Sequence, residues 1–471
     1  MEKSKIEAYA LKNAVEHEGK CQANSVLNSL FVCGLKKEQI KEIMPLIQEI
    51  VKKTNSLNLE EQKKKFAEIE NEGEISHRDV REEGELPELE NAEKNHVIMR
   101  IAPYPSGPLH IGNTRQLVLN DEYAKKYLGK LLFVIDDTIG SEEKQIAPEA
   151  YELIPKGIEW MGVSYEKPII YKSDRLEIYY KYAEEIIKKD KAYVCSCSSD
   201  LLRENRKNGK ECWCRKQKIE ENLKLWKEMF SAKEGKLALR IKTSMKHPNP
   251  AFRDRVIFRI CDREHARVGK KYRVWPLLDF SWAIDDRLLG ITHIIRGKEL
   301  MIETDMERYI FEIFGWKEPV FIHTGLFQFE GVKLSKSKGQ KEVRSGSYIG
   351  WHDPRTWSLQ SLEKRGFVPE AIRKFIISQG LTKGEVTVPI DSLYAMNRGL
   401  IKEKAIQARF EQLKKKSKDA IEIIMPDAKI ILGKSDLEHK GLKNEDIIHF
   451  KGFGFCRFNK HEKVKFWFGH E

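Results

Sequence analysis

Hydrophobic positions along residues 1–53 recur at intervals of three or four, with polar residues between them. This is the period of one face of a helix. From about residue 58 to residue 95 the chain is mostly charged, and its apolar residues are scattered. That composition is typical of a helix end followed by a solvated linker. We therefore predict an N-terminal helical module with a charged linker over residues 1–95.

The hydrophobic pattern changes at residue 96. Short apolar runs that suit strands occupy 97–101, 130–135, 291–295 and 320–323. Amphipathic stretches that suit helices run from near His110 through Tyr127 and over 149–162, 173–190, 280–285 and 301–314. This alternation favours a parallel sheet with crossover helices. We predict that residues 96–194 and 276–340 are two halves of one Rossmann-like α/β domain.

The segment between those halves, residues 195–275, is rich in Arg and Lys and contains two strand-like runs, 237–241 and 256–260. It is predicted to be a basic insertion. Residues 341–398 are mostly helical in pattern. Residues 399–471 hold four strand candidates, 421–424, 429–432, 446–450 and 464–468, which indicate a small β-structure. Its many aromatic residues suit a core, although exposed aromatics in a basic setting could stack on unpaired bases.

Charge narrows the choice of partner. The chain has 84 Lys and Arg against 72 Asp and Glu, a formal net charge of +12. This balance favours a polyanionic partner such as nucleic acid. The alternative is a Lys/Glu-rich surface adapted to solubility or heat. The first residues are polar and no apolar run is long enough to span a bilayer, so we expect a cytoplasmic protein that does not use a membrane.

Four of the eight cysteines form two close pairs, Cys195-x-Cys197 and Cys212-x-Cys214, with fourteen residues between the pairs. Four thiolates in two pairs suit tetrahedral Zn²⁺, and a reducing compartment favours metal over disulfides. The alternative is four reduced cysteines in a loop-rich subdomain. We predict a zinc site made by these four residues.

The stretch from Met99 to Asn113 reads as a strand, a proline-rich loop and the start of a helix. A helix N-terminus attracts phosphate, and Gly112 in its first turn allows close approach to the backbone. The alternative is an ordinary proline-rich turn. Two further strand ends carry charge: Asp136 and Asp137 suit an ammonium group or a metal, and Arg296 suits a carboxylate. The corresponding alternatives are a helix cap and a surface arginine.

The string Val332-Lys-Leu-Ser-Lys-Ser-Lys-Gly339 holds lysines beside serines. In a chain this rich in lysine it could be a solvated loop. Flexible lysines and serines are also suited to hold a polyphosphate while charge shifts on it.

Taken in order, His110-Ile-Gly-Asn113 and Lys333-Leu-Ser-Lys-Ser337, flanking a basic insertion, resemble the signatures of class I aminoacyl-tRNA synthetases. The segments Arg100–Pro103, Asp136–Thr138, Ile284–Gly297 and Trp351–Arg355 look like the glutamyl/glutaminyl subgroup. Residues Leu11–Val15 of the helical module are similar to archaeal glutamyl-tRNA synthetases. The resemblance covers nearly the whole chain and weakens after about Arg398.

The resemblance implies roles for matching residues. Arg296 would pair with the side-chain carboxylate of glutamate, Arg100 would contact the amino acid, and Asp136 would take its α-ammonium. His110 and Lys336 would act in catalysis. Contacts to ATP would come from His110, Gly112, Asn113, Lys333, Ser335, Lys336 and Ser337. The inserted domain would bind the tRNA acceptor end, the segment 341–398 its stem, and the C-terminal β-barrel its anticodon.

The implied activity is two-step attachment of L-glutamate to tRNA(Glu) through a glutamyl-adenylate, with ATP and Mg²⁺, by a monomer. Whether tRNA(Gln) also receives glutamate stays open. Three alternatives are a glutaminyl-tRNA synthetase, a nucleotidyltransferase acting on a small molecule, and a non-catalytic RNA-binding protein of synthetase descent. Arg296 counts against the glutaminyl-tRNA synthetase, and the basic insertion counts against the small-molecule nucleotidyltransferase. The intact His110 and Lys336 count against the non-catalytic protein.

Two positions depart from the pattern. Asn113 stands where the signature usually ends in histidine, and Leu278 stands where a tyrosine that helps hold the amino acid is expected. The C-terminal region also looks shorter than the tandem barrels of relatives, so we expect anticodon reading to be reduced or rearranged.

Overall fold

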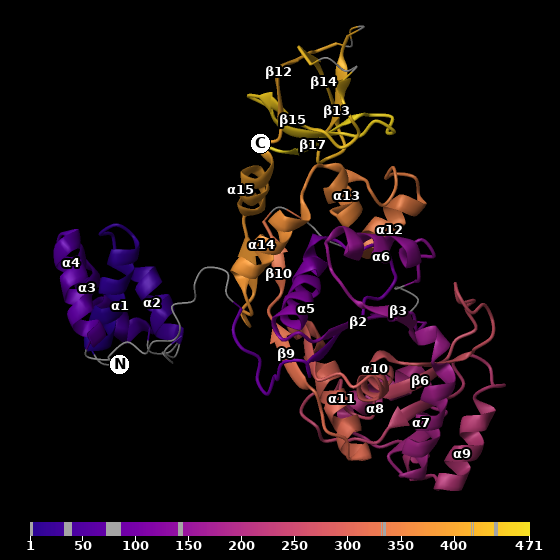
Figure 1. The fold of residues 1–471 in the computed structure, drawn as a ribbon. Helices are drawn as coiled ribbons and strands as arrows, with labels where there is room; N and C mark the ends of the chain where they lie inside the picture. The colour runs from indigo at the N-terminus through magenta and orange to yellow at the C-terminus, as the bar shows by residue number, and fades with distance from the viewer. Residues whose placement is uncertain are drawn as a thin grey trace. The chain divides into compact units, whose positions relative to one another are not determined.

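A computed structural model describes residues 3–32, 40–71, 86–139, 145–330, 332, 336–415, 417, 419–437 and 441–471. The chain divides into two compact units, Met1–Glu82 and Glu83–Glu471 (Figure 1). Each unit has its own hydrophobic core. They are described separately below.

The N-terminal unit is helical, as its hydrophobic period predicts. Its described helices are α1 (Lys3–Glu16), α2 (Ala23–Val32), α3 (Ile40–Asn55) and α4 (Leu59–Asn71). Their apolar faces meet in a small core that includes Ile6, Val26 and Ile47. The side-chain amide of the buried Gln62 donates to the backbone carbonyls of Gly19, Thr54 and Leu57, and so ties α4 to both helix connections.

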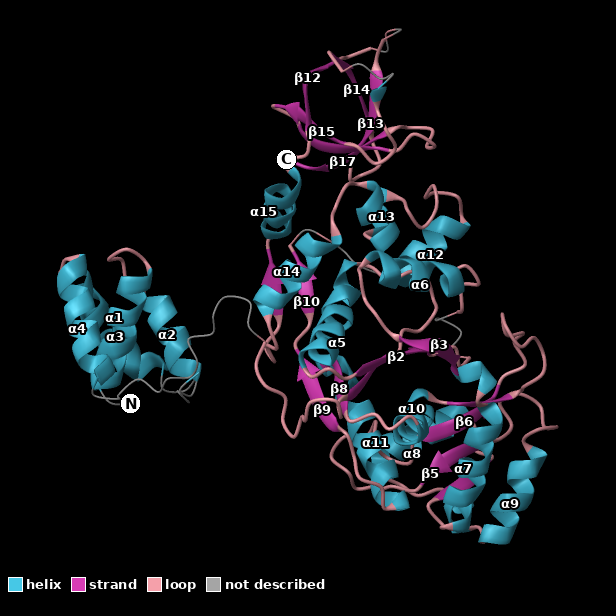
Figure 2. Ribbon diagram, in the orientation of Figure 1, coloured by secondary structure: helices cyan, strands magenta, loops and turns pink. Residues whose placement is uncertain are grey.

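Parallel strands and covering helices form the α/β part of the second unit (Figure 2). Strands β1 (Ile98–Ile101), β2 (Lys130–Ile135) and β3 (Glu166–Tyr171) pair in the order β1-β2-β3, and β8 (His293–Gly297) pairs with β9 (Val320–Thr324). The Thr292 N–H donates to the carbonyl of Ile98 at 2.9 Å, so β8 continues the sheet beyond β1. Helices of this part are α5 (Thr114–Lys126), α6 (Ala150–Trp160), α10 (Leu278–Leu288) and α11 (Met301–Phe314).

The predicted strand over 291–295 begins two residues later than expected. The Ile291 N–H donates to the carbonyl of Asp286 at 2.9 Å, which closes the end of α10 and keeps Ile291 out of the sheet. The helix expected near His110 likewise starts with a short 3-10 turn, η2 (Ile111–Asn113), before α5.

The basic insertion contains an antiparallel sheet in the order β4 (Ala192–Cys195), β5 (Ala238–Ile241), β6 (Val256–Ile260) and β7 (Val274–Pro276). Helices α7 (Leu176–Lys188), α8 (Ser199–Asn208) and α9 (Ile219–Glu228) lie around it (Figure 2). The two strands predicted in this segment are β5 and β6. Strands β3, β4 and β7 were not predicted, because each is only three to six residues long.

The remaining residues form a helical region and a closed barrel. The helices are α12 (Lys336–Arg344), α13 (Leu359–Lys364), α14 (Pro369–Gln379) and α15 (Ile390–Ile401), and β10 (Phe327–Phe329) pairs with β11 (Val386–Val388). The barrel order is β12 (Ile406–Gln412), β14 (Ile430–Ser435), β13 (Ile421–Ile424), β17 (Phe466–His470), β16 (Gly454–Phe458) and β15 (Ile447–Lys451).

Most aromatic residues near the chain's end lie in the core of this barrel rather than on its surface. Phe450, Phe458, Phe466 and Phe468 are buried in one apolar cluster, and Phe453 packs half-buried against it. The α/β multidomain fold with a small C-terminal barrel is thus confirmed.

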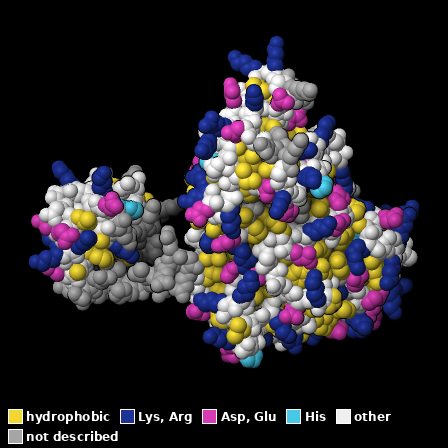
Figure 3. Space-filling view, turned by 45° about the horizontal axis from the view of Figure 1, so that its top comes forward, with side chains coloured by type: hydrophobic (Ala, Val, Ile, Leu, Met, Phe, Trp, Pro, Cys, Tyr) yellow, Lys and Arg dark blue, Asp and Glu magenta, His cyan; other side chains and the backbone are white. Residues whose placement is uncertain are grey.

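Basic side chains are spread over the face of the molecule shown in Figure 3, with acidic side chains between them. Among the described residues, none of the helices combines the length and the apolar character that a membrane span requires.

Candidate active site and cysteine cluster

A cavity of about 440 Å³ opens where β1 and β8 end. It is lined by the loop after β1, the start of α5, Trp282 of α10 and the turn after β8. Four predicted site residues line it: Arg100, His110, Asn113 and Arg296. The structure therefore brings together residues that are nearly two hundred positions apart in the chain, at the carboxyl edge of the sheet where ligands of such folds bind.

His110 and Asn113 hold the loop-to-helix junction together. The His110 Nδ1 accepts a hydrogen bond from the Gly112 N–H at 3.1 Å, and the Asn113 side-chain carbonyl accepts one from the His110 N–H at 3.1 Å. This reciprocal cap satisfies two backbone donors at a helix start. Asn113, at the position where histidine was expected, therefore caps the helix start, and it also lines the cavity.

Arg100 lies at the end of β1 and is buried against Asp286 of α10. Its Nη2 donates to Asp286 Oδ2 at 2.8 Å, and its Nε donates to Asp286 Oδ1. This bidentate pair fixes the plane of the guanidinium. The N–H groups that Asp286 leaves unused remain for a ligand in the cavity.

Arg296, in β8, is also held by a buried carboxylate, through a single hydrogen bond. Its Nη1 donates to Glu307 Oε1 at 2.7 Å, and its Nη2 donates to Thr304 Oγ1 at 2.6 Å. Both partners lie on α11 and are buried. Burial raises the pKa of Glu307 to about 7, against the opposing effect of the Arg296 charge. Arg296 is therefore held in place by a carboxylate whose own ionisation lies near neutral pH.

Both arginines lie close to the ring of Trp282 on α10. The guanidinium carbon of Arg100 is 4.8 Å from the ring centroid, and that of Arg296 is 5.3 Å away. An aromatic face attracts cations and so offsets the repulsion between two neighbouring guanidinium groups. Trp282 lines the cavity, whereas Leu278, one helical turn earlier, does not. The sequence pattern pointed to position 278 and missed Trp282.

Asp136 lies apart from the cavity. It is fully buried and is not among the residues that line the cavity. Its Oδ1 accepts a hydrogen bond from the Thr138 hydroxyl at 3.0 Å, and its Oδ2 lies 3.2 Å from Lys172 Nζ. Asp137 accepts hydrogen bonds from the N–H and hydroxyl of Ser173 and from the hydroxyl of Tyr151. Both carboxylates thus have partners inside the protein.

The structure describes only part of the lysine- and serine-rich segment 332–339. Lys333 and Ser335 lie outside the described residues, and only the backbone of Lys336 and Ser337 is described, as the first turn of α12. Their predicted contacts to ATP stay predictions.

Comparison with known proteins shows the family of the chain. The family model described as "tRNA synthetases class I (E and Q), catalytic domain" matches residues 96–403. A glutamate–tRNA ligase from Pyrococcus furiosus is 46% identical over 83% of this chain and 69% of its own length. The chain belongs to the glutamate–tRNA ligase family.

Other relatives show the same relationship. The glutamate–tRNA ligase of Methanothermobacter marburgensis is 41% identical over 84% of this chain and 71% of its own length. That of Methanocaldococcus jannaschii is 41% identical over 85% of this chain and 71% of its own length. The archaeal type of ligase expected from the sequence motifs is confirmed.

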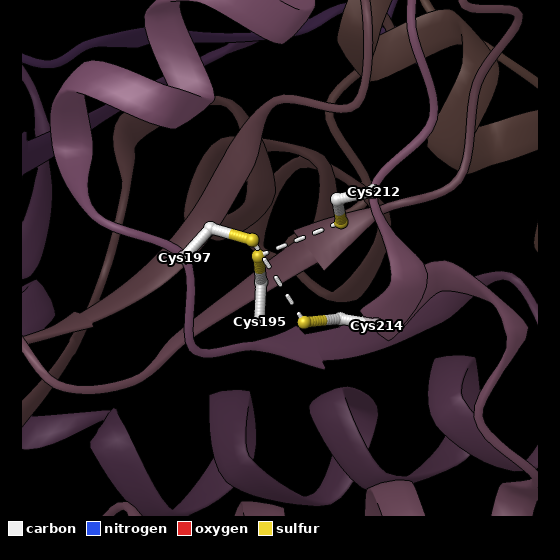
Figure 4. Close-up of side chains that lie close together, drawn as sticks. All are labelled: Cys195, Cys197, Cys212 and Cys214. Carbon is white, nitrogen blue, oxygen red and sulfur yellow. Dashed lines mark hydrogen bonds between the residues drawn. The ribbon is translucent and has the colours of Figure 1, made fainter.

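The four predicted zinc ligands of this glutamate–tRNA ligase do converge (Figure 4). The sulfur atoms of Cys195, Cys197, Cys212 and Cys214 all lie within 4.8 Å of one another. Cys195 Sγ is 3.8 Å from Cys212 Sγ, and Cys197 Sγ is 4.0 Å from Cys214 Sγ. Zn–S bonds of about 2.3 Å in a tetrahedron require sulfur separations of about 3.8 Å. The residues present therefore fit Zn²⁺.

A buried cation lies beside two of these sulfur atoms. Arg240 Nη1 lies 3.7 Å from Cys195 Sγ and 3.6 Å from Cys212 Sγ, and the side chain is almost fully buried. The hydrogen bond between Cys195 and Cys212 lowers the pKa of the Cys212 thiol to about 4 and raises the pKa of the Cys195 thiol. A buried cation beside Cys195 and Cys212 would offset part of the negative charge that a four-thiolate zinc site carries.

Proposed function

We propose that this ligase activates L-glutamate in the cavity between β1 and β8, with the side-chain carboxylate on Arg296 and Arg100 in contact with the same amino acid. One observation carries the proposal: two buried arginines, each fixed by its own carboxylate, face one cavity from neighbouring strands. Fixed forks of N–H donors match the geometry of a carboxylate. Glutamate, with two carboxylates, suits two such forks.

The reaction needs little acid–base chemistry. The α-carboxylate of glutamate is already a nucleophile, and its oxygen attacks the α-phosphorus of ATP while pyrophosphate leaves. A hydroxyl of the tRNA 3′-terminal adenosine then attacks the carbonyl carbon of the mixed anhydride, and AMP leaves. The protein's part is to position the reactants and to stabilise charge on the phosphoryl oxygens.

ATP is proposed to lie on the His110–Asn113 turn, where backbone N–H groups begin α5. Lys336, at the start of α12, would stabilise the phosphates together with Lys333, Ser335 and Ser337. Glu299 is the one acidic side chain among the described residues that line the cavity. Because a cage of carboxylates is lacking there, Mg²⁺ would arrive on the ATP phosphates, where it neutralises their charge.

The choice of amino acid follows from Arg296. Glutamine would place an uncharged amide against a buried guanidinium, and the loss of a charge-assisted hydrogen bond in a buried site is costly. This choice does not depend on which tRNA is bound. We therefore propose that any tRNA(Gln) that the enzyme accepts receives glutamate rather than glutamine.

The cysteine cluster is proposed to hold Zn²⁺, which when bound would cross-link the start of the insertion. Cys195 ends β4, while Cys212 and Cys214 belong to the segment around the 3-10 turn η4 (Trp213–Lys216). Fixing these two segments would give the insertion a defined surface for the acceptor end of tRNA. We propose that the ligase acts as a monomer.

Charging of purified tRNA tests the proposal directly. The wild-type enzyme is incubated with ATP and either glutamate or glutamine, on tRNA(Glu) and separately on tRNA(Gln). We expect glutamyl-tRNA(Glu) and no glutaminyl product on either tRNA. Glutaminyl-tRNA as the main product would reject the proposed role of Arg296, and glutamate charging without any dependence on ATP would reject the adenylate route.

A further inference from the structure

Trp282 on α10 carries a buried hydrogen-bond donor that lacks an acceptor. Its side chain is 5% exposed and lines the cavity, and its indole N–H has no hydrogen-bond partner within the residues that the structure describes. Tryptophan offers one N–H and no acceptor, and a buried indole N–H usually finds a partner. Because an unsatisfied buried donor is costly, this N–H is a candidate contact for a ligand in the cavity.

The neighbouring Arg296 holds a second donor of this kind. Its Nη1 and Nη2 donate to Glu307 and Thr304, but its buried Nε has no partner in the described part of the chain. The guanidinium carbon lies 5.3 Å from the centroid of the Trp282 ring, and both side chains line the cavity. A third unpartnered atom among the lining side chains, Asn120 Oδ1, is an acceptor and so has no part in holding an anion.

An unsatisfied indole N–H is not by itself a ligand contact. Trp275 of β7 has one too, and its ring stacks on His265 in the core of the insertion. The two tryptophans differ in what surrounds them, since Trp275 does not line the cavity and Trp282 does. A ligand in the cavity could therefore supply an acceptor to Trp282 and not to Trp275.

Two adjacent donors without an acceptor favour one chemical class of ligand group. Both oxygens of a carboxylate accept hydrogen bonds, whereas an amide has one oxygen and sets its NH₂ group against the other donor. Such a site binds a carboxylate and rejects the corresponding amide. The α-carboxylate of glutamate must reach the α-phosphorus of ATP, so the side-chain carboxylate is the group that can stay on these donors.

We propose that Trp282 is a substrate-binding residue whose indole N–H and the Nε–H of Arg296 each donate to one oxygen of the side-chain carboxylate of glutamate. The inference rests on the proposed binding of glutamate in this cavity. It adds a second donor to that site, from α10, and names the nitrogen of Arg296 that makes the contact. Trp282 thereby shares with Arg296 the choice of glutamate over glutamine.

The first test is Trp282→Phe, which keeps an aromatic ring beside the arginines and removes the N–H. The ratio of kcat/KM for glutamate to kcat/KM for glutamine is measured on tRNA(Glu). We expect this ratio to fall about tenfold or more, because a hydrogen bond to a charged group is worth about that factor. Trp275→Phe is the matched control, since it removes a buried unpartnered N–H outside the cavity. It should leave the ratio within about twofold of wild type.

A second replacement separates the hydrogen bond from packing, because phenylalanine is smaller than tryptophan. Benzothienylalanine at position 282 keeps the bicyclic shape and puts sulfur in place of the N–H group. It should lower the ratio as Trp282→Phe does. A wild-type ratio with benzothienylalanine would show that Trp282 acts through packing alone and would overturn the proposal.

The indole N–H signal of Trp282 reports the contact directly, in the nuclear magnetic resonance spectrum of the full-length, isotope-labelled enzyme. Trp282→Phe and Trp275→Phe identify the two signals by their loss. Titration of the wild-type enzyme with L-glutamate should move the Trp282 signal downfield, as its proton gains an acceptor, and leave the Trp275 signal in place. A Trp282 signal that does not move at saturating glutamate would overturn the proposal.

Failure of the proposed function would look different. In that case the wild-type enzyme would not charge tRNA(Glu) with glutamate, or Arg296→Gln would keep the preference of wild type for glutamate. If the preference depends on Arg296 and not on the N–H of Trp282, the proposed function stands and only the contact from Trp282 is rejected.

Discussion

The cysteine cluster and the amino-acid cavity are built in opposite ways. The cluster draws four sulfurs from two short segments with fourteen residues between them, and the distances between these sulfur atoms suit a tetrahedral metal. The cavity draws its charged groups from β1, α10, β8 and α11, over about two hundred residues. A local cluster can be predicted from spacing alone, whereas the cavity depends on how the whole sheet is assembled.

The cysteine cluster and the cavity differ in the partners of their buried cations. In the cluster, one buried arginine faces several thiols. In the cavity, each of the two buried arginines has its own carboxylate. Substitutions in the cavity should therefore show strong pairwise coupling, while those in the cluster should act through the metal.

The largest effect should come from Arg100→Leu. It removes one partner of a buried ion pair, and such truncations cost about 2–5 kcal/mol, so we expect kcat/KM for glutamate to fall about 1000-fold. Adding Asp286→Leu removes the stranded carboxylate as well. Thermal unfolding of the double variant should recover toward wild type, while charging stays low. Recovery of charging by the double variant would show that Arg100 acts only through stability.

The second-largest effect is expected on zinc binding by the cysteine cluster. Cys214→Ser should abolish stoichiometric zinc binding in competition with a chelator, with a loss of affinity above about 100-fold, because it removes a ligand rather than a supporting group. Cys261→Ser is the matched control, since Cys261 is a buried cysteine of the same insertion outside the cluster. Equal zinc content, by atomic emission, in the two variants would contradict the assignment.

A smaller effect is expected from Arg240→Met, which keeps the length of the side chain and removes its charge. Supporting groups around metal ligands are worth about 10–100-fold in affinity, so zinc binding should weaken by that factor. The Co²⁺-substituted protein should keep its tetrahedral absorption. Arg206→Met, at an arginine that donates to the Pro250 and Ala251 carbonyls, is the control. A zinc affinity equal to wild type in Arg240→Met would show that the charge of Arg240 does not stabilise the zinc-bound cluster.

The smallest effect concerns pH. Burial raises the pKa of Glu307 to about 7, so below pH 7 the carboxyl is protonated and the Arg296 charge is less compensated. We expect the KM for glutamate to rise about two- to tenfold from pH 6 to pH 8. In Glu307→Gln the KM should stay flat over that range. If the KM of Glu307→Gln rose with pH as it does in wild type, a group other than Glu307 would be responsible for the pH dependence.

The same ionisation has a consequence for stability. The folded state binds this proton more tightly than the unfolded chain, because the pKa of Glu307 is raised on folding. Its contribution to stability is therefore full below the ordinary pKa of 4.5 and is lost as pH rises through about 7.

Much of the fold followed from hydrophobic periodicity. Long amphipathic stretches such as 301–314 match helix α11 residue for residue, and the run 130–135 matches β2. Short strands such as β3 and β7 were not predicted, because a run of three to six residues carries too weak a pattern. Their strand form is decided by neighbours already in the sheet.

The residues of the candidate site were also predicted only in part. Arg100, His110, Asn113 and Arg296 lie in recognisable motifs and do line one cavity. Two side chains that contact these arginines were not singled out from the sequence, Trp282 on α10 and Glu307 on α11. A carboxylate or lysine on an amphipathic helix or at a strand end looks like a surface residue until the partner's position is known.

The central claim is that Arg296 selects glutamate by its side-chain carboxylate. The most direct measurement is the ratio of kcat/KM for glutamate to kcat/KM for glutamine on tRNA(Glu), in wild type, Arg296→Gln and the control Arg308→Gln, whose arginine pairs with Glu318 at the surface. We predict that Arg296→Gln lowers this ratio by about 1000-fold or more, while Arg308→Gln leaves it unchanged. Undiminished preference for glutamate in Arg296→Gln would contradict the account.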